Sequence, residues 1–178
     1  MDNMDRDDLG LLQVYTGEGK GKTTAALGLV LRAWGHGLRV CVIQFMKRGE
    51  DYGEVKALRK LGIEIFQFGS GKLIVKGRHC QDDLDCADRA LDLSRSILSS
   101  GEFDVVILDE VNVAMSFGLI RCCDVLEVLR ARSSGVEVIC TGRNAPDELM
   151  KEADLVTVMT LEKHPYDEGL SARKGIEY

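Results

Sequence analysis

Short apolar runs alternate with longer amphipathic stretches along the whole chain. Near-continuous apolar runs such as VCVIQF and VVILD are typical of strands that are buried on both faces of a parallel sheet. Each run is bounded by Gly, Asp or a charged turn. They predict six strands, at Leu11–Thr16, Val40–Phe45, Ile63–Phe68, Val105–Leu108, Val136–Thr141 and Leu155–Met159.

The stretches between these runs have helical character. Within the Asp- and Arg-rich stretch 84–98, apolar residues repeat on one face, as in a helix packed on a sheet. A helix is also predicted to begin near Lys22, and Pro146 followed by two acidic residues suits the start of another. Alternating strands and helices predict a doubly wound α/β fold with a mostly parallel sheet. We find no repeat or linker, so residues 1–178 are predicted to form a single domain with a short N-terminal arm at 1–10.

Composition and charge narrow the class of protein. A chain of 178 residues, 45% of them hydrophobic, is long enough to bury the core of one domain. The formal charge of −6 argues against nucleic acid as the main partner, because phosphate-backbone binding depends on clustered Lys and Arg. The N-terminus MDNMDRDDLG lacks the basic and apolar regions of a secretory signal, and no apolar run approaches the ~20 residues that span a bilayer. We therefore expect a cytoplasmic protein with no membrane partner.

The six cysteines include no C-x-x-C pair. Cys41 and Cys140 lie in apolar strand-like runs, where free cysteine behaves as a small hydrophobic residue. Structural thiols are therefore favoured over metal ligands.

The stretch TGEGKGKTT at residues 16–24 is the main candidate for chemistry. It matches the end of the phosphate-loop pattern G-x-x-x-x-G-K-[ST], but Thr16 stands where the pattern has its first glycine. The stretch follows a predicted strand and opens a predicted helix, which is the context that the motif requires. Lys22 is expected to reach phosphate oxygens, and the Thr23 hydroxyl to bind Mg²⁺. Backbone N–H groups can converge on an anion around Gly17, Gly19 and Gly21.

Two carboxylates follow the fourth predicted strand. Asp109 and Glu110 end the run VVILDE, as in a Walker B strand, and each is a candidate to hold Mg²⁺ directly or through water. Arg143, after the fifth strand, is either a phosphate contact or a surface arginine with a structural hydrogen bond. The carboxyl edge of the sheet, where open α/β folds bind ligands, should also bring together Gln44, Lys47, Arg48, Thr141, Gly142 and Asn144.

Five segments resemble a known family: TGEGKGKTTAALGLVLRAWGHG, VIQFMKRG, VVILDEVNVA, TGRNAPDEL and KHPYDEGLSARKGIEY. The chain resembles the P-loop-type corrinoid adenosyltransferases, which act on cob(I)alamin or cob(I)yrinic acid a,c-diamide, from about Gln13 to Tyr178. The loop with Thr16 and the closing segment are the most specific parts. The resemblance implies a P-loop NTPase-like (RecA-like) fold. It also implies that the tail 163–178 folds near the nucleotide, where composition alone suggests a frayed end.

The resemblance implies a reaction in which Co(I) of a reduced corrinoid attacks the ribose C5′ of ATP and expels tripolyphosphate, during adenosylcobalamin biosynthesis or salvage. Mg²⁺ or Mn²⁺ as cofactor, a flavin-type reductant and a homodimer belong to the same expectation. Lys22, Thr23 and Glu110 are then the catalytic residues, with Asp109 as a further metal candidate. The ATP-binding segment comprises Gly17, Glu18, Gly19, Lys20, Gly21, Lys22, Thr23 and Thr24, and Arg143 is added as a candidate contact.

One departure from the family concerns the loop after the third strand. Relatives commonly have aromatic residues there that help to activate cobalt, whereas this chain has Leu73 and Ile74, which are either apolar wedges or ordinary core. No D-x-H-x-x-G motif surrounds any of the three histidines. Two alternative functions stay open: an ATPase or kinase in which Glu110 orients a water, and an ATP-gated module that delivers a corrinoid.

Overall fold

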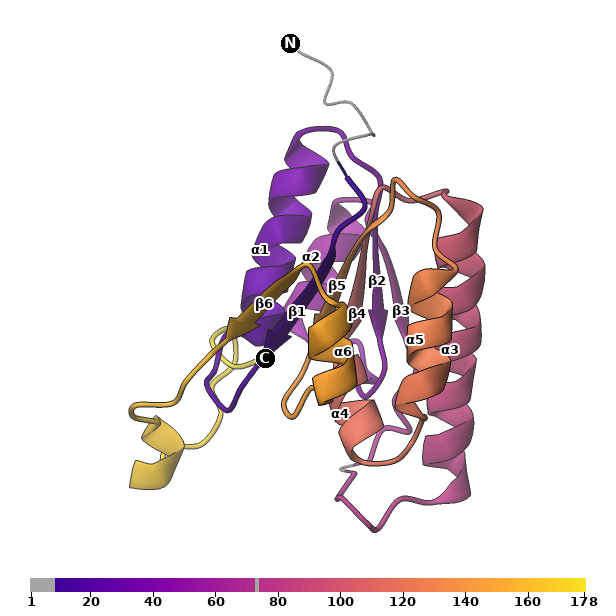
Figure 1. Cartoon of the computed structure of the whole chain (residues 1–178). Coiled ribbons are helices and arrows are strands. Elements are labelled where there is room, and N and C mark those ends of the chain that lie inside the picture. Colours follow the sequence, from indigo (N-terminus) through magenta and orange to yellow (C-terminus); the bar gives the residue numbers. More distant parts are fainter. Residues whose placement is uncertain (1–8, 73) are drawn as a thin grey trace.

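The central feature of the fold is a six-stranded parallel sheet with the order β3-β2-β4-β5-β1-β6 (Figure 1). The computed structural model describes residues 9–72 and 74–178, except for the side chain of Asp167. Every strand pairing among these residues is parallel, so the sheet is more regular than the mostly parallel one predicted. The six predicted strands are all present, as β1 (Leu12–Thr16), β2 (Val40–Gln44), β3 (Glu64–Gln67), β4 (Val105–Asp109), β5 (Glu137–Thr141) and β6 (Leu155–Val158).

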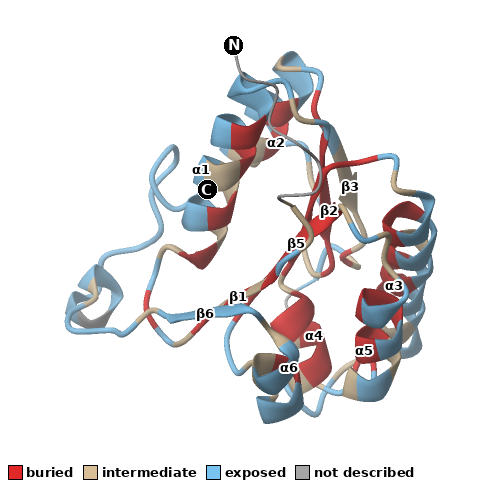
Figure 2. Cartoon of the chain, turned by 45° about the horizontal axis from the view of Figure 1, so that its top comes forward, coloured by how far each residue is buried: buried red, intermediate tan, exposed pale blue. Residues whose placement is uncertain are grey.

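The burial of the strands follows their place in the sheet. Every residue of β2, β4 and β5 is buried, which explains why their sequences are almost continuously apolar. The edge strand β6 is exposed along its whole length. Figure 2 shows this contrast between the central strands and β6.

Helices cover both faces of the sheet and complete one α/β domain. One face packs on α1 (Lys22–Gly35) and α2 (Gly53–Lys60). The other packs on α3 (Gln81–Ser100), α4 (Val111–Ser116), α5 (Cys122–Arg130) and α6 (Asp147–Glu152) (Figure 1). The predicted start of a helix at Lys22 is confirmed, and α6 begins directly after Pro146.

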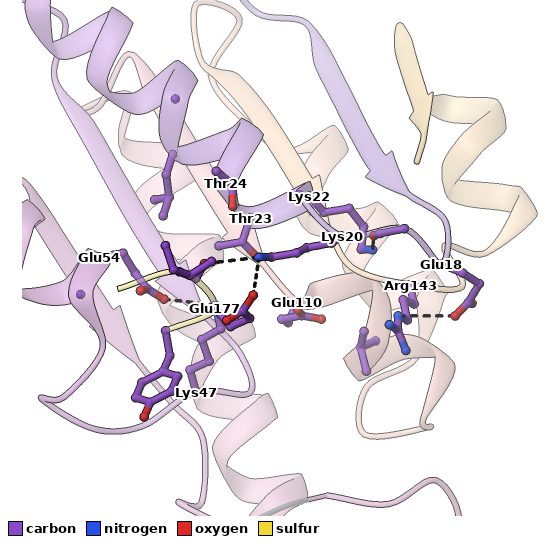
Figure 3. Close-up of a pocket in the computed structure, with 18 of the residues that line it drawn as sticks. Glu18, Lys20, Lys22, Thr23, Thr24, Lys47, Glu54, Glu110, Arg143 and Glu177 are labelled. Carbon is purple, nitrogen blue, oxygen red and sulfur yellow. Dashed lines mark hydrogen bonds and ion pairs between the residues drawn. The ribbon is translucent and has the colours of Figure 1, made fainter. Parts of the chain in front are cut away.

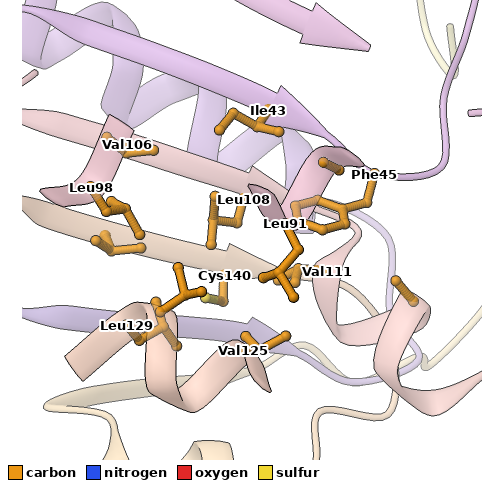
Figure 4. Packing of buried hydrophobic residues seen from close by; sticks show 14 of the residues in the cluster. Ile43, Phe45, Leu91, Leu98, Val106, Leu108, Val111, Val125, Leu129 and Cys140 are labelled. Carbon is orange, nitrogen blue, oxygen red and sulfur yellow. The ribbon is translucent and has the colours of Figure 1, made fainter. Parts of the chain in front are cut away.

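The larger core lies between the sheet and α3 and α5. Successive residues of a strand point to opposite faces, so Leu108 joins this core while its neighbour Ile107 joins the core beneath α1. Figure 4 shows Leu91 of α3 and Leu129 of α5 packed over the strands. Ile74 packs partly against the same core, which favours the ordinary-core interpretation; Leu73 lies outside the described residues, as do residues 1–8 of the predicted N-terminal arm.

The strand cysteines behave as structural thiols. Cys41 and Cys140 are buried, and burial raises the pKa of each thiol to about 12. Neither thiol therefore ionises near neutral pH, and neither is poised to act as a nucleophile. Within the described part of the chain, no helix is long and apolar enough to cross a bilayer.

Candidate functional site

A cavity of about 940 Å³ lies at the carboxyl edge of the sheet (Figure 3). It is lined by the loop between β1 and α1, by the first turns of α1, by residues that follow β2, β4 and β5, and by the end of the chain. This is the edge at which parallel α/β sheets bind ligands. The segments that the sequence singled out therefore meet around one space.

The loop between β1 and α1 packs closely against the end of β6. Gly17 has a left-handed backbone (φ 96°), and the Gly19 N–H donates to the Met159 carbonyl at 2.7 Å. A Cβ on Gly19 would collide with the carbonyl oxygens of Met159 and Thr160. Glycine is required at these positions because the backbone of β6 approaches so closely.

Thr16 explains why this loop departs from the usual pattern. It is the buried last residue of β1, and its hydroxyl accepts a hydrogen bond from the Ala145 N–H at 3.1 Å. Its carbonyl accepts from the Met159 N–H at 2.8 Å. A glycine would lose the link to Ala145, so Thr16 ties the phosphate loop to the segment that follows β5.

Lys22 begins α1 and is largely buried. Its ammonium donates to the carbonyls of Gly17 at 2.7 Å and Gly19 at 2.6 Å, which holds the loop in a ring around the side chain. Burial, followed by the charge of Arg143, lowers the pKa of Lys22. The positive end of α1 adds to the attraction of this region for an anion.

Asp109 is completely buried, and both of its carboxylate oxygens accept hydrogen bonds. Oδ1 accepts from the hydroxyls of Thr23 and Thr141, each at 2.8 Å. Oδ2 accepts from Gln44 Nε2 at 3.0 Å and Lys47 Nζ at 3.1 Å. With four donors in place, Asp109 is better suited to orienting Thr23 than to binding a metal directly; of the two modes predicted for it, contact through water fits this geometry.

Glu110 lines the cavity beside Asp109 and has an unusual backbone. Its φ of 64° is left-handed, and its N–H donates to Thr141 Oγ1 at 3.1 Å. Burial, followed by the charge of Asp109, raises the pKa of Glu110, although Lys47 and nearby cations oppose the shift. The second non-glycine residue with a left-handed backbone in the described ranges, Asn144, lines the same cavity. Such strained residues are concentrated at functional sites.

The donor set suits a hard divalent cation. The hydroxyl of Thr23 and the carboxylate of Glu110 are oxygen donors of the kind that Mg²⁺ prefers, and both line the cavity. Residues 9–72 and 74–178 contain no group of three or more His, Cys, Asp or Glu that could hold a metal by itself.

Further charged residues surround the mouth of the cavity. Arg143 Nε lies 3.4 Å from Glu18 Oε2, and both side chains are more than half exposed. Arg143 therefore makes a surface ion pair, and its side chain also lines the cavity, where it is placed to contact a phosphate. Lys20 and Thr24 line the cavity as well.

The chain end forms the remaining wall. His164, just before the short 3₁₀ helix η2 (Pro165–Glu168), lines the cavity, and after η2 the tail turns back so that residues 175–178 line it as well. Glu177 accepts from Lys20 Nζ at 3.0 Å and also pairs with Arg173. These hydrogen bonds, chiefly that from Arg173, lower the pKa of Glu177 to about 2.

Sequence reasoning missed Asn112. Its side chain is fully buried and donates to the carbonyls of Gly142 at 3.2 Å and Tyr15 at 3.4 Å. Asn112 therefore joins the ends of β1 and β5 beneath the cavity. An asparagine in an apolar helical stretch is the only sequence feature that points to it.

The fold and the site together define a P-loop-type α/β protein with a nucleotide-sized cavity lined by both cations and carboxylates. The family model described as "ATP:corrinoid adenosyltransferase BtuR/CobO/CobP" matches residues 8–178. The chain belongs to this family and is thus a transferase enzyme.

Individual relatives agree with this assignment. The chain is 36% identical over 174 residues to the corrinoid adenosyltransferase of Pseudomonas aeruginosa, an alignment that covers 97% of this chain and 86% of the relative. It is 33% identical over 173 residues to that of Escherichia coli strain K12, covering 97% and 88%. A solved structure, the flagellar accessory protein FlaH from Methanocaldococcus jannaschii, aligns with a TM-score of 0.55 at 13% identity, covering 88% of this chain and 78% of FlaH; this likeness concerns the fold alone.

Proposed function

We propose that the protein transfers the 5′-deoxyadenosyl group of ATP to the Co(I) of a reduced corrinoid and releases tripolyphosphate. In this reaction the Co–C5′ bond forms and the C5′–O bond breaks, and its electron pair leaves on the triphosphate oxygen. The observation that carries the proposal is a phosphate loop with lysine ammonium groups around one cavity, in a chain that matches the family over nearly its full length.

The loop has a physical role in such a reaction. Charge gathers on the whole triphosphate as it leaves, so donors that are already fixed in place lower the barrier. Lys22 is held by the loop carbonyls, and the start of α1 presents backbone N–H groups in the same direction. The substrate cobalt is the nucleophile, so the protein needs to supply alignment and charge stabilisation only.

Thr23 and Glu110 are the side chains that would hold Mg²⁺, or Mn²⁺, together with the phosphates. Such a cation supplies neutralisation of the negative charge on the leaving group. Asp109 keeps the Thr23 hydroxyl in position through its 2.8 Å hydrogen bond. The other proposed ATP contacts are the loop residues Gly17, Glu18, Gly19, Lys20 and Gly21, with Thr24 and Arg143.

The remaining expectations from the family belong to the same proposal. The acceptor is cob(I)alamin or cob(I)yrinic acid a,c-diamide, the reductant is of flavin type, and the enzyme acts as a cytoplasmic homodimer. The tail 163–178 covers the bound nucleotide. Support for this last point comes from Ile176 and Tyr178, which line the same cavity as the phosphate loop.

Phosphorus NMR of the products is the test of the reaction. The protein is mixed with MgATP and chemically reduced Co(I) corrinoid without oxygen. Tripolyphosphate together with a light-sensitive alkylcobalt species is the expected result. ADP and inorganic phosphate without alkylcobalt would replace the proposal by a γ-phosphate-cleaving ATPase or kinase, and corrinoid binding without nucleotide turnover would replace it by a delivery module.

A further inference from the structure

Lys47 is a partly buried cation of the cavity that lies outside the phosphate loop. It follows β2, and its carbonyl accepts a hydrogen bond from the Gly69 N–H at 3.0 Å. Its ammonium lies 3.1 Å from Asp109 Oδ2 and 3.4 Å from Glu54 Oε1. Backbone and side chain are thus both held, and the end of the side chain lines the cavity (Figure 3).

The lysine remains charged in this setting. The two carboxylates within 3.4 Å of the ammonium, those of Asp109 and Glu54, favour its charged form. A protonated ammonium has three N–H donors. Two of them are directed at Asp109 and Glu54. The ammonium also lies over the Tyr52 ring, 6.0 Å from its centre, but no third hydrogen-bond acceptor is found for it within the described ranges.

Lys47 balances the charge of Asp109, but this pairing does not use the whole ammonium group. Asp109 already accepts hydrogen bonds from Thr23, Thr141 and Gln44. The Lys47 side chain is still 21% exposed, and it shares the cavity with the phosphate loop. Asp109 also fixes the distance between the Thr23 hydroxyl and the Lys47 ammonium, because its Oδ1 accepts from the hydroxyl and its Oδ2 from the ammonium.

We infer that Lys47 is a further phosphate-binding residue of this site, which contacts a triphosphate oxygen with its third N–H while Asp109 and Glu54 fix its position. The inference rests on the proposed function, in which the whole triphosphate is the leaving group. Lys22 then acts from the loop and Lys47 from the end of β2, so charge on the leaving group is stabilised from two separate elements. Lys47 touches substrate in this arrangement and is a catalytic residue.

Binding of tripolyphosphate alone, measured by calorimetry without corrinoid, is the first test. Lys47→Met should weaken tripolyphosphate binding about 10-fold or more, the scale of one charge-assisted contact. Adenosine, which has no phosphate, should compete for the site equally well in both proteins. The matched control is Lys56→Met, which removes an exposed lysine of α2 that pairs with Asp51 outside the cavity and should leave tripolyphosphate binding unchanged. Equal tripolyphosphate affinity in Lys47→Met and Lys56→Met would overturn the inference.

A second variant separates ligand contact from a structural role. Glu54→Gln keeps an acceptor for the Lys47 ammonium but no longer offsets its charge, so it should tighten tripolyphosphate binding about 3-fold, and this gain should disappear in the double variant with Lys47→Met. If Glu54→Gln tightened tripolyphosphate binding equally in the presence of Lys47 and of Lys47→Met, Lys47 would have no contact with phosphate. Lys47→Arg should recover part of the affinity that Lys47→Met loses. Because these measurements follow binding, they stand whichever products the NMR experiment finds.

Discussion

The cavity has two walls that are held in different ways. The wall built from the phosphate loop and the ends of β2, β4 and β5 is fixed by buried hydrogen bonds that converge on Asp109. The opposite wall, residues 175–178 of the tail, is attached to the phosphate loop through an exposed ion pair of Lys20 with Glu177, while the pair of Arg173 with Glu177 lies within the tail itself. Buried networks are rigid and costly to break, whereas exposed pairs contribute little. The site thus combines a preorganised phosphate cradle with a wall that is free to adjust to the rest of the substrate.

The largest expected effect is the loss of activity on removing a loop side chain. Lys22→Ala and Thr23→Ala should each reduce alkylcobalt formation at least ~10²-fold, because each removes charge stabilisation on the leaving group. Circular dichroism should show an intact fold, since neither residue belongs to the two hydrophobic cores. Full activity in both variants would contradict the role given to the rigid wall.

Asp109→Asn should break the rigid wall itself. The substitution removes the negative charge that faces Lys47. It also places an NH₂ group, a donor, among the donors that now bond to Asp109, so the free energy of unfolding should fall by about 3–5 kcal/mol. Urea denaturation measures this change, and ATP affinity should fall with it. Asp124→Asn, at an exposed pair with Arg121, is the control and should leave the unfolding midpoint unchanged. Wild-type stability in Asp109→Asn would show that the hydrogen bonds on this carboxylate do not hold the wall.

Removing the tail should leave the stability almost unchanged but weaken ATP binding. A chain that ends at Lys163 should unfold within a few degrees of the full-length protein, because the removed residues are mostly exposed. Its ATP affinity should nevertheless fall about 10-fold as Ile176 and Tyr178 are lost from the cavity, roughly the value of one well-buried apolar side chain. Glu177→Gln, which keeps the wall and removes only its charge, serves as the comparison and should change affinity by less than about 3-fold. Unaltered ATP affinity in the truncated chain would exclude the tail from the site.

The smallest expected effect concerns pH. The pKa of Glu177 is lowered from 4.5 to about 2 by its hydrogen bonds, first among them that from Arg173. Because the folded-state value is depressed, the contribution of this contact to stability is present above pH 4.5 and is lost as the pH falls through about 2. The carboxyl carbon resonance of Glu177, identified by its absence from Glu177→Gln, should still report an ionised group at pH 3. A midpoint near 4.5 would mean that the tail is not held in this position.

The rigid wall is also the part that the sequence predicts best. Its strands are read from near-continuous apolar runs, and the start of α1 from the glycine-rich turn and Lys22, because burial on both faces and helix initiation leave local patterns. Of the four short helices, α2, α4 and α5 were not predicted individually, since 6 to 9 residues give few periods to detect, whereas the start of α6 was indicated by Pro146 and the acidic residues after it.

The set of hydrogen bonds that meet at Asp109 could not be predicted from the apolar runs or from the glycine-rich turn. Gln44 and Thr141 were expected at the carboxyl edge, but their contact with Asp109 depends on β2 and β5 flanking β4 in the sheet. In that order Gln44 lies directly beside Asp109, and Leu108 beside Cys140 brings Thr141 next to it. Strand order and register are properties of the folded sheet, so a chain-order pattern does not contain them.

The fate of the chain end has a practical side. Gly19 is bonded to Met159 where the tail leaves the sheet, and the last residue, Tyr178, lies on the cavity lining. The tail is therefore held at its start by the contact of Met159 with the phosphate loop, and its last residues line the cavity. An affinity tag fused after Tyr178 would begin at the cavity lining, so a preparation tagged there should bind ATP more weakly until the tag is cleaved.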